Sequence, residues 1–208
     1  MEKPNTFLAK FISVVFHPLL MPSYALVIIF NSNTHYSYMP FEAQRLIYIL
    51  VFLCTFLIPV STIPFLMNLK VVSGASLKNH RERIIPLFIS ALSYYFAYYL
   101  LNQLPISTIG FIKIMVLASA VLIGLSLFIS FKWKISAHLI GIGGLIASMF
   151  YYAVYFVADF TYLIILLSLA AGTIAYARLI LQAHNPAQVY IGFLTGFIGM
   201  LLILYLGL

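Results

Sequence analysis

Charged side chains are scarce in this chain. Only 7% of its 208 residues are charged, whereas 64% are hydrophobic. A soluble domain carries about 25% charged residues, so the composition excludes a soluble globular protein. Cysteine is nearly absent as well. The single Cys54 lies inside an apolar run, which excludes an intrachain disulfide and argues against a thiolate role.

Acidic residues are almost missing. The chain has four, and they stand far apart: Glu2, Glu42, Glu82 and Asp159. Because Mg²⁺ is held by carboxylates gathered at one point, we expect no metal site, and nothing else in the sequence predicts a cofactor. The formal net charge is +7, but the basic residues lie singly or in short clusters beside apolar runs. That distribution favours contact with the bilayer and its anionic headgroups over nucleic acid.

Long apolar runs are what the sequence does contain. A membrane-spanning helix needs about 20 apolar residues, so the runs predict an all-α, polytopic transmembrane bundle of about six to seven spans. With no internal repeat and no long linker, we expect residues 1–208 to form a single integral membrane domain. The predicted spans are 11–30, 46–69, 84–102, 109–131, 138–157, 160–178 and 186–206.

Prolines interrupt the first two runs. Pro18, which follows His17, and Pro22 lie in the first, and Pro59 and Pro64 lie in the second. Proline removes a backbone donor, so we expect kinked packing helices here. The first run is too long for a signal-peptide core and is expected to be retained as a span.

Seven crossings would place the N-terminus and the breaks at 70–83, 132–137 and 178–185 on one side, which we call the basic face. Only Arg45 and Lys113 would remain for the opposite side. Three histidines, His80, His138 and His184, would also join the basic face. Its basic residues would be Lys3, Lys10, Lys70, Lys78, Arg81, Arg83, Lys132, Lys134 and Arg178. This convergence of cations and imidazoles predicts an anion site.

The break at 78–86 reads KNHRERIIP and holds Lys78, Arg81 and Arg83. Neighbouring cations repel one another unless an anion lies among them, and arginine binds phosphate oxygens bidentately. A phosphate site and a basic loop against acidic lipid headgroups both remain open for this cluster.

The break from Lys132 to Gly144 reads KWKISAHLIGIGG. Ser136 is placed to cap the following helix, whose first amides, at Ala137 and His138, would then be free to bind an anion. His138 would lie beside them, where it can protonate a leaving oxygen. The alternative is a simple helix cap followed by an interfacial histidine.

The third break contains His184 and Asn185 and follows Arg178. Asn185 suits the N-cap position and Pro186 the first helical position. Gln188, four residues after His184, can hydrogen-bond to its imidazole. A histidine held in this way can attack phosphorus as a nucleophile, while arginine and helix amides stabilise the charge on the phosphoryl oxygens.

These three stretches resemble the signature motifs of the type 2 phosphatidic acid phosphatase (PAP2) superfamily, in the same order. They cover residues 78–196. The first motif, Lys-x6-Arg-Pro, matches at Lys78 and Pro86, with Ile85 in place of the arginine. The second, Pro-Ser-Gly-His, corresponds to ISAH at 135–138. The third, Ser-Arg-x5-His-x3-Asp, corresponds to Ala177 through Gln188 and continues with Val189, Gly192 and Gly196.

The resemblance implies a PAP2-like core and a metal-independent lipid phosphate phosphatase. His184 would form a phosphohistidine, His138 would protonate the leaving lipid oxygen, and Gln188 would take the place of the aspartate that orients the nucleophile. The phosphate would be held by Lys78, Arg83, Ser136, Ala137 and Arg178. The substrate would be a phosphorylated lipid, either a phosphomonoester or a diphosphate, taken from the bilayer.

Gln188 marks a departure from the family, because an amide cannot offset the charge of a histidine. Loss of such a carboxylate costs about 10⁴-fold in a comparable triad. A weakly active or inactive relative that binds lipid headgroups as a scaffold or regulator is therefore the alternative function. Glu82 is a candidate substitute for the missing carboxylate. A transporter or channel is a third hypothesis, based on the proline and glycine breaks.

The resemblance implies location in a bacterial inner membrane, where relatives usually carry the site on the outer side. The basic residues favour the cytoplasmic side instead. When the predicted ligands Lys78, Arg83 and Arg178 are left out, six basic residues remain on the basic face against two opposite. The side of the membrane and the oligomeric state stay open.

Overall fold

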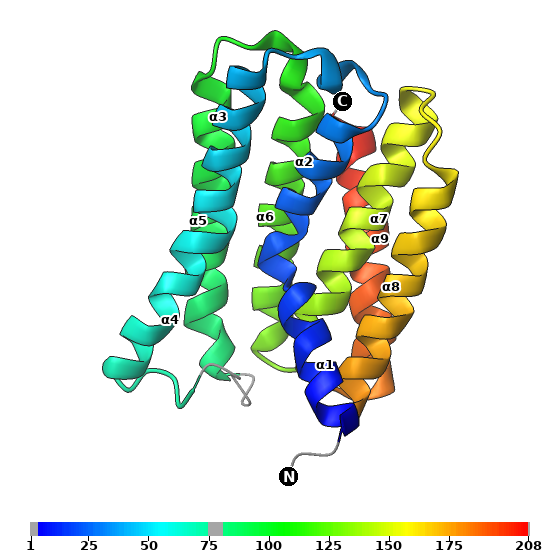
Figure 1. Cartoon of the computed structure of the whole chain (residues 1–208). Coiled ribbons are helices and arrows are strands. Elements are labelled where there is room, and N and C mark those ends of the chain that lie inside the picture. The colour runs from blue at the N-terminus through cyan, green and yellow to red at the C-terminus, as the bar shows by residue number, and fades with distance from the viewer. Residues whose placement is uncertain (1–3, 75–80, 208) are drawn as a thin grey trace.

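The computed structural model describes residues 4–74 and 81–207. The described part of the chain is helical, without strands, and its elements run roughly parallel to one another in one bundle (Figure 1). The predicted all-α class is confirmed. The elements are α1 Pro4–Val15, η1 Pro18–Leu20, α2 Met21–Asn31, η2 His35–Tyr38, α3 Phe41–Phe52, the π-helical η3 Leu53–Leu57, α4 Ile58–Asn68, η4 Arg81–Arg83, α5 Ile84–Gln103, η5 Ser107–Ile109, α6 Gly110–Ser130, α7 Ala137–Tyr155, α8 Thr161–Ile180 and α9 Pro186–Gly207.

Seven helical segments within the described residues are long and apolar enough to cross a membrane, and the chain is therefore an integral membrane protein. Their positions agree with the predicted spans to within a few residues at most ends. They are Asn5–Asn31, Phe41–Asn68, Arg81–Gln103, Ser107–Ser130, Ala137–Tyr155, Thr161–Ile180 and Pro186–Gly207. The N-terminus lies at the lower end of the bundle in Figure 1 and the C-terminus at the upper end, as an odd number of crossings requires.

The predicted kinks have different origins in the two proline-containing spans. In the first, the chain leaves the helix at His17-Pro18, so that α1 packs against α8 while α2 packs against α3 and α7. Pro22 does not interrupt the span, contrary to expectation. It lies in the first turn of α2, where a helical amide has no partner to lose.

In the second span, the disturbance precedes Pro59 as a single π-helical turn. The amide of Ile58 donates to the Leu53 carbonyl, five residues back. Continuing that pattern would require Pro59 to donate to Cys54, which proline cannot do. The Ser93 hydroxyl on α5 donates to the Cys54 carbonyl instead. The freed backbone group is thus satisfied inside the protein, as the bilayer demands.

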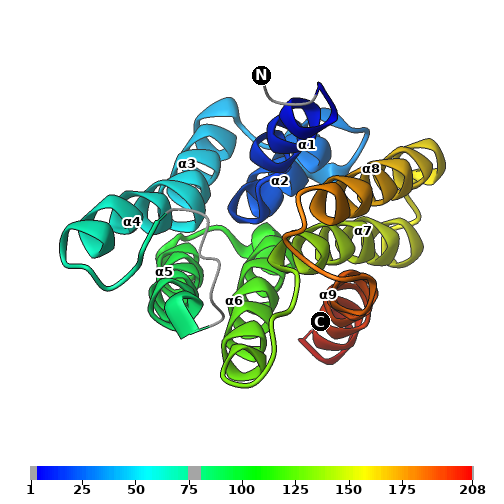
Figure 2. The same ribbon diagram turned by 90° about the horizontal axis from the view of Figure 1, so that it is seen from below.

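Helix α7 is the central element of the fold. It is 67% buried, whereas the other six candidate spans among the described residues are 39% buried or less. Seen from below, it lies among α2, α6, α8 and α9 (Figure 2). The loops before α7 and before α9 both open at the lower end of the bundle. The second and third predicted motifs therefore begin on neighbouring helices at the same face.

Candidate functional site

Three glycines bring the second and third motifs into contact. Added Cβ atoms would lie 2.1 Å from the Ile140 carbonyl oxygen at Gly196, and 2.9 Å from the Ser136 carbonyl oxygen at Gly192. An added Cβ at Gly143, on the facing helix, would lie 2.6 Å from the Phe193 carbonyl oxygen. Such small residues allow membrane helices to approach backbone to backbone. Here they place the start of α7 directly against the start of α9.

A backbone hydrogen bond joins the two loops. The Ser136 amide donates to the Gln188 carbonyl oxygen at 3.3 Å. Ser136 occupies the N-cap position of α7, but the prediction that its side chain caps the helix is wrong. Its hydroxyl is fully buried and has no hydrogen-bond partner in the described structure. The reason is packing: close contact with α9 encloses this side chain.

His184 is held by the capping interactions of α9. Asn185 accepts a hydrogen bond from the Gln188 amide at 2.9 Å, and Gln188 Oε1 accepts one from the Asn185 amide at 3.3 Å. This reciprocal pair is a capping box, and it confirms Asn185 as the N-cap. The same Oε1 atom lies 3.0 Å from His184 Nδ1. Since Oε1 is the acceptor, Nδ1 carries the proton.

His184 is therefore presented as a neutral imidazole with an unprotonated Nε2. The side chain is only 6% exposed, and its Nε2 atom is buried and has no hydrogen-bond partner among the described residues. Burial lowers the pKa of His184 to about 3, and the positive charges of Arg83, Arg178 and Lys134 act in the same direction. The hydrogen bond with Gln188 opposes this shift. A lone pair on Nε2 is the form that nucleophilic attack requires.

Two arginines reach the same region from different helices. Arg83 Nη1 donates to the Ile135 carbonyl oxygen at 2.9 Å, next to Ser136. Arg178 Nη1 donates to the Ser13 hydroxyl at 3.2 Å. Both arginines are close enough to His184 to act on its pKa, and with burial they lower the pKa of Lys134 as well. The structure thus gathers three cations around one imidazole.

Buried polar atoms without partners concentrate at this point. Within the described residues there are six such side-chain atoms, and four of them belong to the predicted site. They are Arg83 Nε, Ser136 Oγ, Arg178 Nε and His184 Nε2. Leaving a buried polar group unpaired costs about 1–3 kcal/mol, so a cluster of four is informative. Two charged N–H donors and a hydroxyl are groups that bind an oxyanion.

The carboxylates of the described residues interact with groups outside the predicted site. Glu82 accepts a hydrogen bond from the Ser73 hydroxyl at 3.0 Å, so it does not replace the carboxylate of the third motif. Glu42 pairs with Arg45 at 3.0 Å, and Asp159 accepts the Thr161 amide at 3.1 Å. No group of three His, Cys, Asp or Glu side chains that could hold a metal ion is found among the residues searched.

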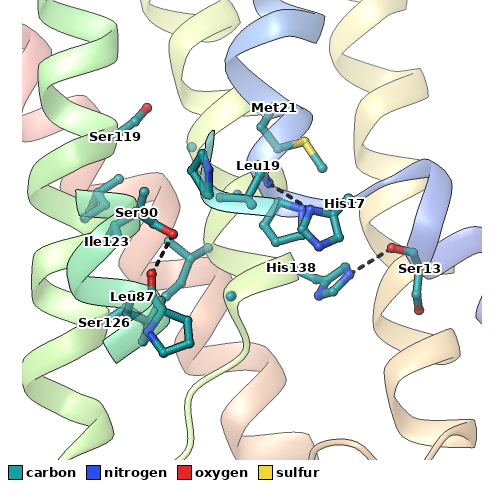
Figure 3. Close-up of a pocket in the computed structure, with 18 of the residues that line it drawn as sticks. Ser13, His17, Leu19, Met21, Leu87, Ser90, Ser119, Ile123, Ser126 and His138 are labelled. Atoms are coloured by element: carbon teal, nitrogen blue, oxygen red, sulfur yellow. Dashed lines mark hydrogen bonds between the residues drawn. The ribbon is translucent and has the colours of Figure 1, made fainter. Parts of the chain in front are cut away.

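His138, the predicted general acid, is held by the first helix. Its Nε2 atom lies 3.0 Å from the Ser13 carbonyl oxygen. The ring of His17 lies edge-on to it, with the ring centroids 5.8 Å apart and the planes 73° apart. Figure 3 shows the two imidazoles and Ser13 on one side of a cavity. His138 is also within electrostatic reach of His184 and Arg178.

A cavity of about 1090 Å³ extends from the basic face into the bundle. Lys10, Arg83, Lys134 and Arg178 line it, together with His17 and His138. Its apolar wall contains Met21, Leu87, Ile123, Ile140 and Met200, and serines such as Ser90, Ser119 and Ser126 lie along it (Figure 3). His184, Ser136 and Gln188 are not part of its lining, although Ala183 is. His184, the predicted nucleophile, thus lies just behind the part of the wall that Ala183 forms.

The structure therefore brings together seven of the eight predicted site residues, from Arg83 to Gln188. The eighth, Lys78, lies outside the described residues, as does His80. Sequence reasoning did not name Ser13, His17 or Lys134 as site residues, although it placed Lys134 on the basic face. The break at His17-Pro18 was a usable signal, because a broken helix frees backbone carbonyls. We did not connect this break with the site, because it lies far from the three motifs in the sequence.

The low pKa of His184 predicts acid-sensitive stability. In the unfolded chain the imidazole has a pKa of about 6.5, whereas the folded value is about 3. Between these values the unfolded chain binds more protons, so the free energy of unfolding falls as the pH falls. The contribution is complete above about pH 6.5 and decreases by up to about 1.4 kcal/mol per pH unit below it.

We expect His184→Gln to be less acid-sensitive than the native protein. Thermal midpoints in detergent, recorded from pH 7.5 to pH 4, measure the difference. The native midpoint should drop more steeply through this range. Parallel curves for the two proteins would contradict the assignment of a neutral, buried His184.

Comparison of the chain with protein-family models, with curated proteins and with solved structures gives no match. What the fold and the site define is thus the coarse class, an all-α integral membrane protein with a buried cationic and imidazole cluster at one face. The PAP2 resemblance stays a prediction from the motifs.

Proposed function

We propose that this protein is a membrane-embedded phosphatase that hydrolyses a lipid phosphate or pyrophosphate through a phosphohistidine intermediate. The observation that carries the proposal is the group of four partnerless buried atoms on Arg83, Ser136, Arg178 and His184. They combine a nucleophilic nitrogen with donors for the oxygens of a phosphoryl group. A phosphoryl-transfer site needs both around one position.

The chemistry follows from the protonation states of the site. His184 Nε2 attacks phosphorus while the Nδ1–H group stays hydrogen-bonded to Gln188 Oε1. The arginine Nε–H groups and the Ser136 hydroxyl stabilise the charge on the equatorial oxygens. His138 protonates the leaving lipid oxygen, and water then hydrolyses the phosphohistidine. Lys78 and the Ala137 amide complete the phosphate ligands that the motifs imply.

The cavity supports a lipid as the substrate. It joins a cationic mouth at the basic face to an apolar interior between membrane-spanning helices. A lipid phosphate would fit this cavity, with its phosphate at the cationic mouth and its acyl or prenyl chain in the apolar interior. We place the protein in a bacterial inner membrane, with phosphomonoester and diphosphate lipids as its candidate substrates.

The test is phosphate release by purified protein from a panel of lipid phosphates and lipid diphosphates. A phosphodiester lipid of the same chain length serves as the control substrate and should release none. Release from the panel that is equal in the native protein and in His184→Ala would contradict the proposal.

The second candidate function is a weakly active or inactive relative that binds lipid phosphate as a scaffold or regulator. Gln188 favours it, because the amide orients His184 but cannot compensate a positive charge on the imidazole. The structure also shows that glutamine has its own structural use here, in the capping box with Asn185.

Gln188→Glu separates the two functions. Glutamate has the same length, preserves the capping box and supplies the missing charge. If the native protein is a weak relative, turnover should rise by about 100-fold or more, toward the roughly 10⁴-fold value of a triad carboxylate. If the native protein is an efficient phosphatase, native turnover is readily measured and the change stays below about tenfold. Gln188→Ala, which removes both cap and acceptor, should lower activity in either case.

A further inference from the structure

Helix α1 ends in a way that frees a backbone carbonyl beside the site. The last amide of the helical pattern is that of Phe16, which donates to the Ile12 carbonyl at 2.9 Å. A continuing helix would use the next amide, from His17, for the Ser13 carbonyl. His17 is instead extended, with φ −64° and ψ 133°, as residues before proline commonly are. Pro18 itself has no amide hydrogen.

His138, the predicted general acid, forms a hydrogen bond with the freed carbonyl. His138 Nε2 lies 3.0 Å from the Ser13 carbonyl oxygen. A carbonyl can only accept, so Nε2 carries the proton and Nδ1 is the nitrogen left for chemistry. The edge of the His17 ring, with its centroid 5.8 Å away, restricts the plane of the imidazole further.

The Ser13 side chain also contacts a second residue of the site, Arg178. Ser13 is 9% exposed, and its hydroxyl accepts a hydrogen bond from Arg178 Nη1 at 3.2 Å. The hydroxyl hydrogen is directed to the Ala9 carbonyl at 2.9 Å. This arrangement leaves an oxygen lone pair for the guanidinium. One residue of the first span therefore contacts groups from α7 and α8.

We propose that Ser13 is a positioning residue of the site, whose carbonyl orients His138 and whose hydroxyl orients Arg178. This role rests on the proposed phosphatase function. As the bond from His184 Nε2 to phosphorus forms, the bond from phosphorus to the lipid oxygen breaks, and its electron pair stays on that oxygen. His138, which takes up a second proton on Nδ1 once the anionic phosphate is bound beside it, gives that proton to this oxygen, while Nε2 keeps its own proton in the hydrogen bond to the Ser13 carbonyl. Water then displaces His184 from phosphorus and returns a proton to His138.

Pro18→Ala tests the carbonyl, because alanine lets the helix continue and lets backbone amides compete for Ser13. The probes are a lysophosphatidate, whose alkoxide must be protonated on leaving, and p-nitrophenyl phosphate, whose phenolate leaves unaided. We expect kcat for lysophosphatidate to fall by about 100-fold, the effect of a small misplacement of a catalytic group, with p-nitrophenyl phosphate nearly unaffected. Pro22→Ala is the matched control, since both prolines line the cavity and only Pro18 ends a helix.

Ser13→Ala tests the hydroxyl and does not alter the backbone. Loss of one hydrogen bond to a charged group should raise KM by about tenfold for both substrates, with kcat for lysophosphatidate retained. If Pro18→Ala lowers both rates equally, or neither, the carbonyl role is wrong. If Pro18→Ala does not fold, an unchanged KM in Ser13→Ala overturns the proposal. A native protein that cleaves neither substrate would contradict the phosphatase function itself.

Discussion

Replacing His184 with alanine is expected to lower phosphate release by about 10⁴- to 10⁶-fold, the range seen when a covalent nucleophile is removed. Alanine keeps the buried backbone and the capping box between Asn185 and Gln188, so the α9 start should stay in place. Initial rates on the best lipid of the panel measure the loss. Brief incubation with ³²P-labelled substrate should label the native protein through an acid-labile, base-stable bond and leave His184→Ala unlabelled.

His35→Ala is the matched control for this experiment. His35 also has a ring nitrogen 3.0 Å from a single side-chain partner, the Tyr152 hydroxyl. It lies in the connection between α2 and α3, at the upper end of the bundle in Figure 1 and away from the basic face. We expect His35→Ala to keep native turnover and labelling. Native rates in His184→Ala, or labelling that survives in it, would contradict a phosphohistidine.

Gly196→Ala is expected to have the second-largest effect, on stability and activity together. The new Cβ would lie 2.1 Å from the Ile140 carbonyl oxygen. Neither atom belongs to a flexible side chain, so α7 and α9 must move apart. Overpacking costs about 1–3 kcal/mol even where side chains can adjust, and a contact with the backbone belongs at the upper end of that range or beyond. Separation also moves His184 away from His138, which should reduce turnover by about 100-fold or more.

Two other glycines provide the controls for Gly196→Ala. A Cβ at Gly124 in α6, or at Gly172 in α8, would meet no heavy atom within 4 Å. Alanine is favoured over glycine inside a helix by about 1 kcal/mol, so these variants should be neutral or slightly more stable. Thermal midpoints in detergent and phosphate release measure all three. A native midpoint in Gly196→Ala would show that the α7–α9 contact is looser than the structure indicates.

The local features of the site could be predicted because they lie within one helical turn. Asn185 as the cap of α9 and the contact of Gln188 with His184 span three and four residues. The positions of the membrane spans were equally predictable, because length and hydropathy act along the chain. Counting crossings then placed the three breaks on one face, and the described parts of all three lie at the lower end of the bundle in Figure 1.

Other features depended on contacts that no local pattern encodes. Ser136 has the sequence position of a helix cap, yet close packing against α9 encloses its hydroxyl without a cap bond. Glu82 has the right charge to assist His184 but is turned to Ser73. Pro18 and Pro22 look alike in sequence, and only the start of α2 at Met21 makes Pro22 harmless.

Composition and neighbours along the chain were enough to predict an all-α membrane protein with about six to seven spans, a basic face, and a His184 that contacts Gln188 beside the cap of a helix. Which groups share the site depended on the packing of helices that are far apart in the sequence. The contacts of Ser13 with His138 and with Arg178 join residues 125 and 165 positions apart, and they exist because the packing of α1 against α8 and of α7 against α9 brings these helix ends together. The four partnerless polar atoms are a property of the same packing, since burial depends on which helices enclose a side chain.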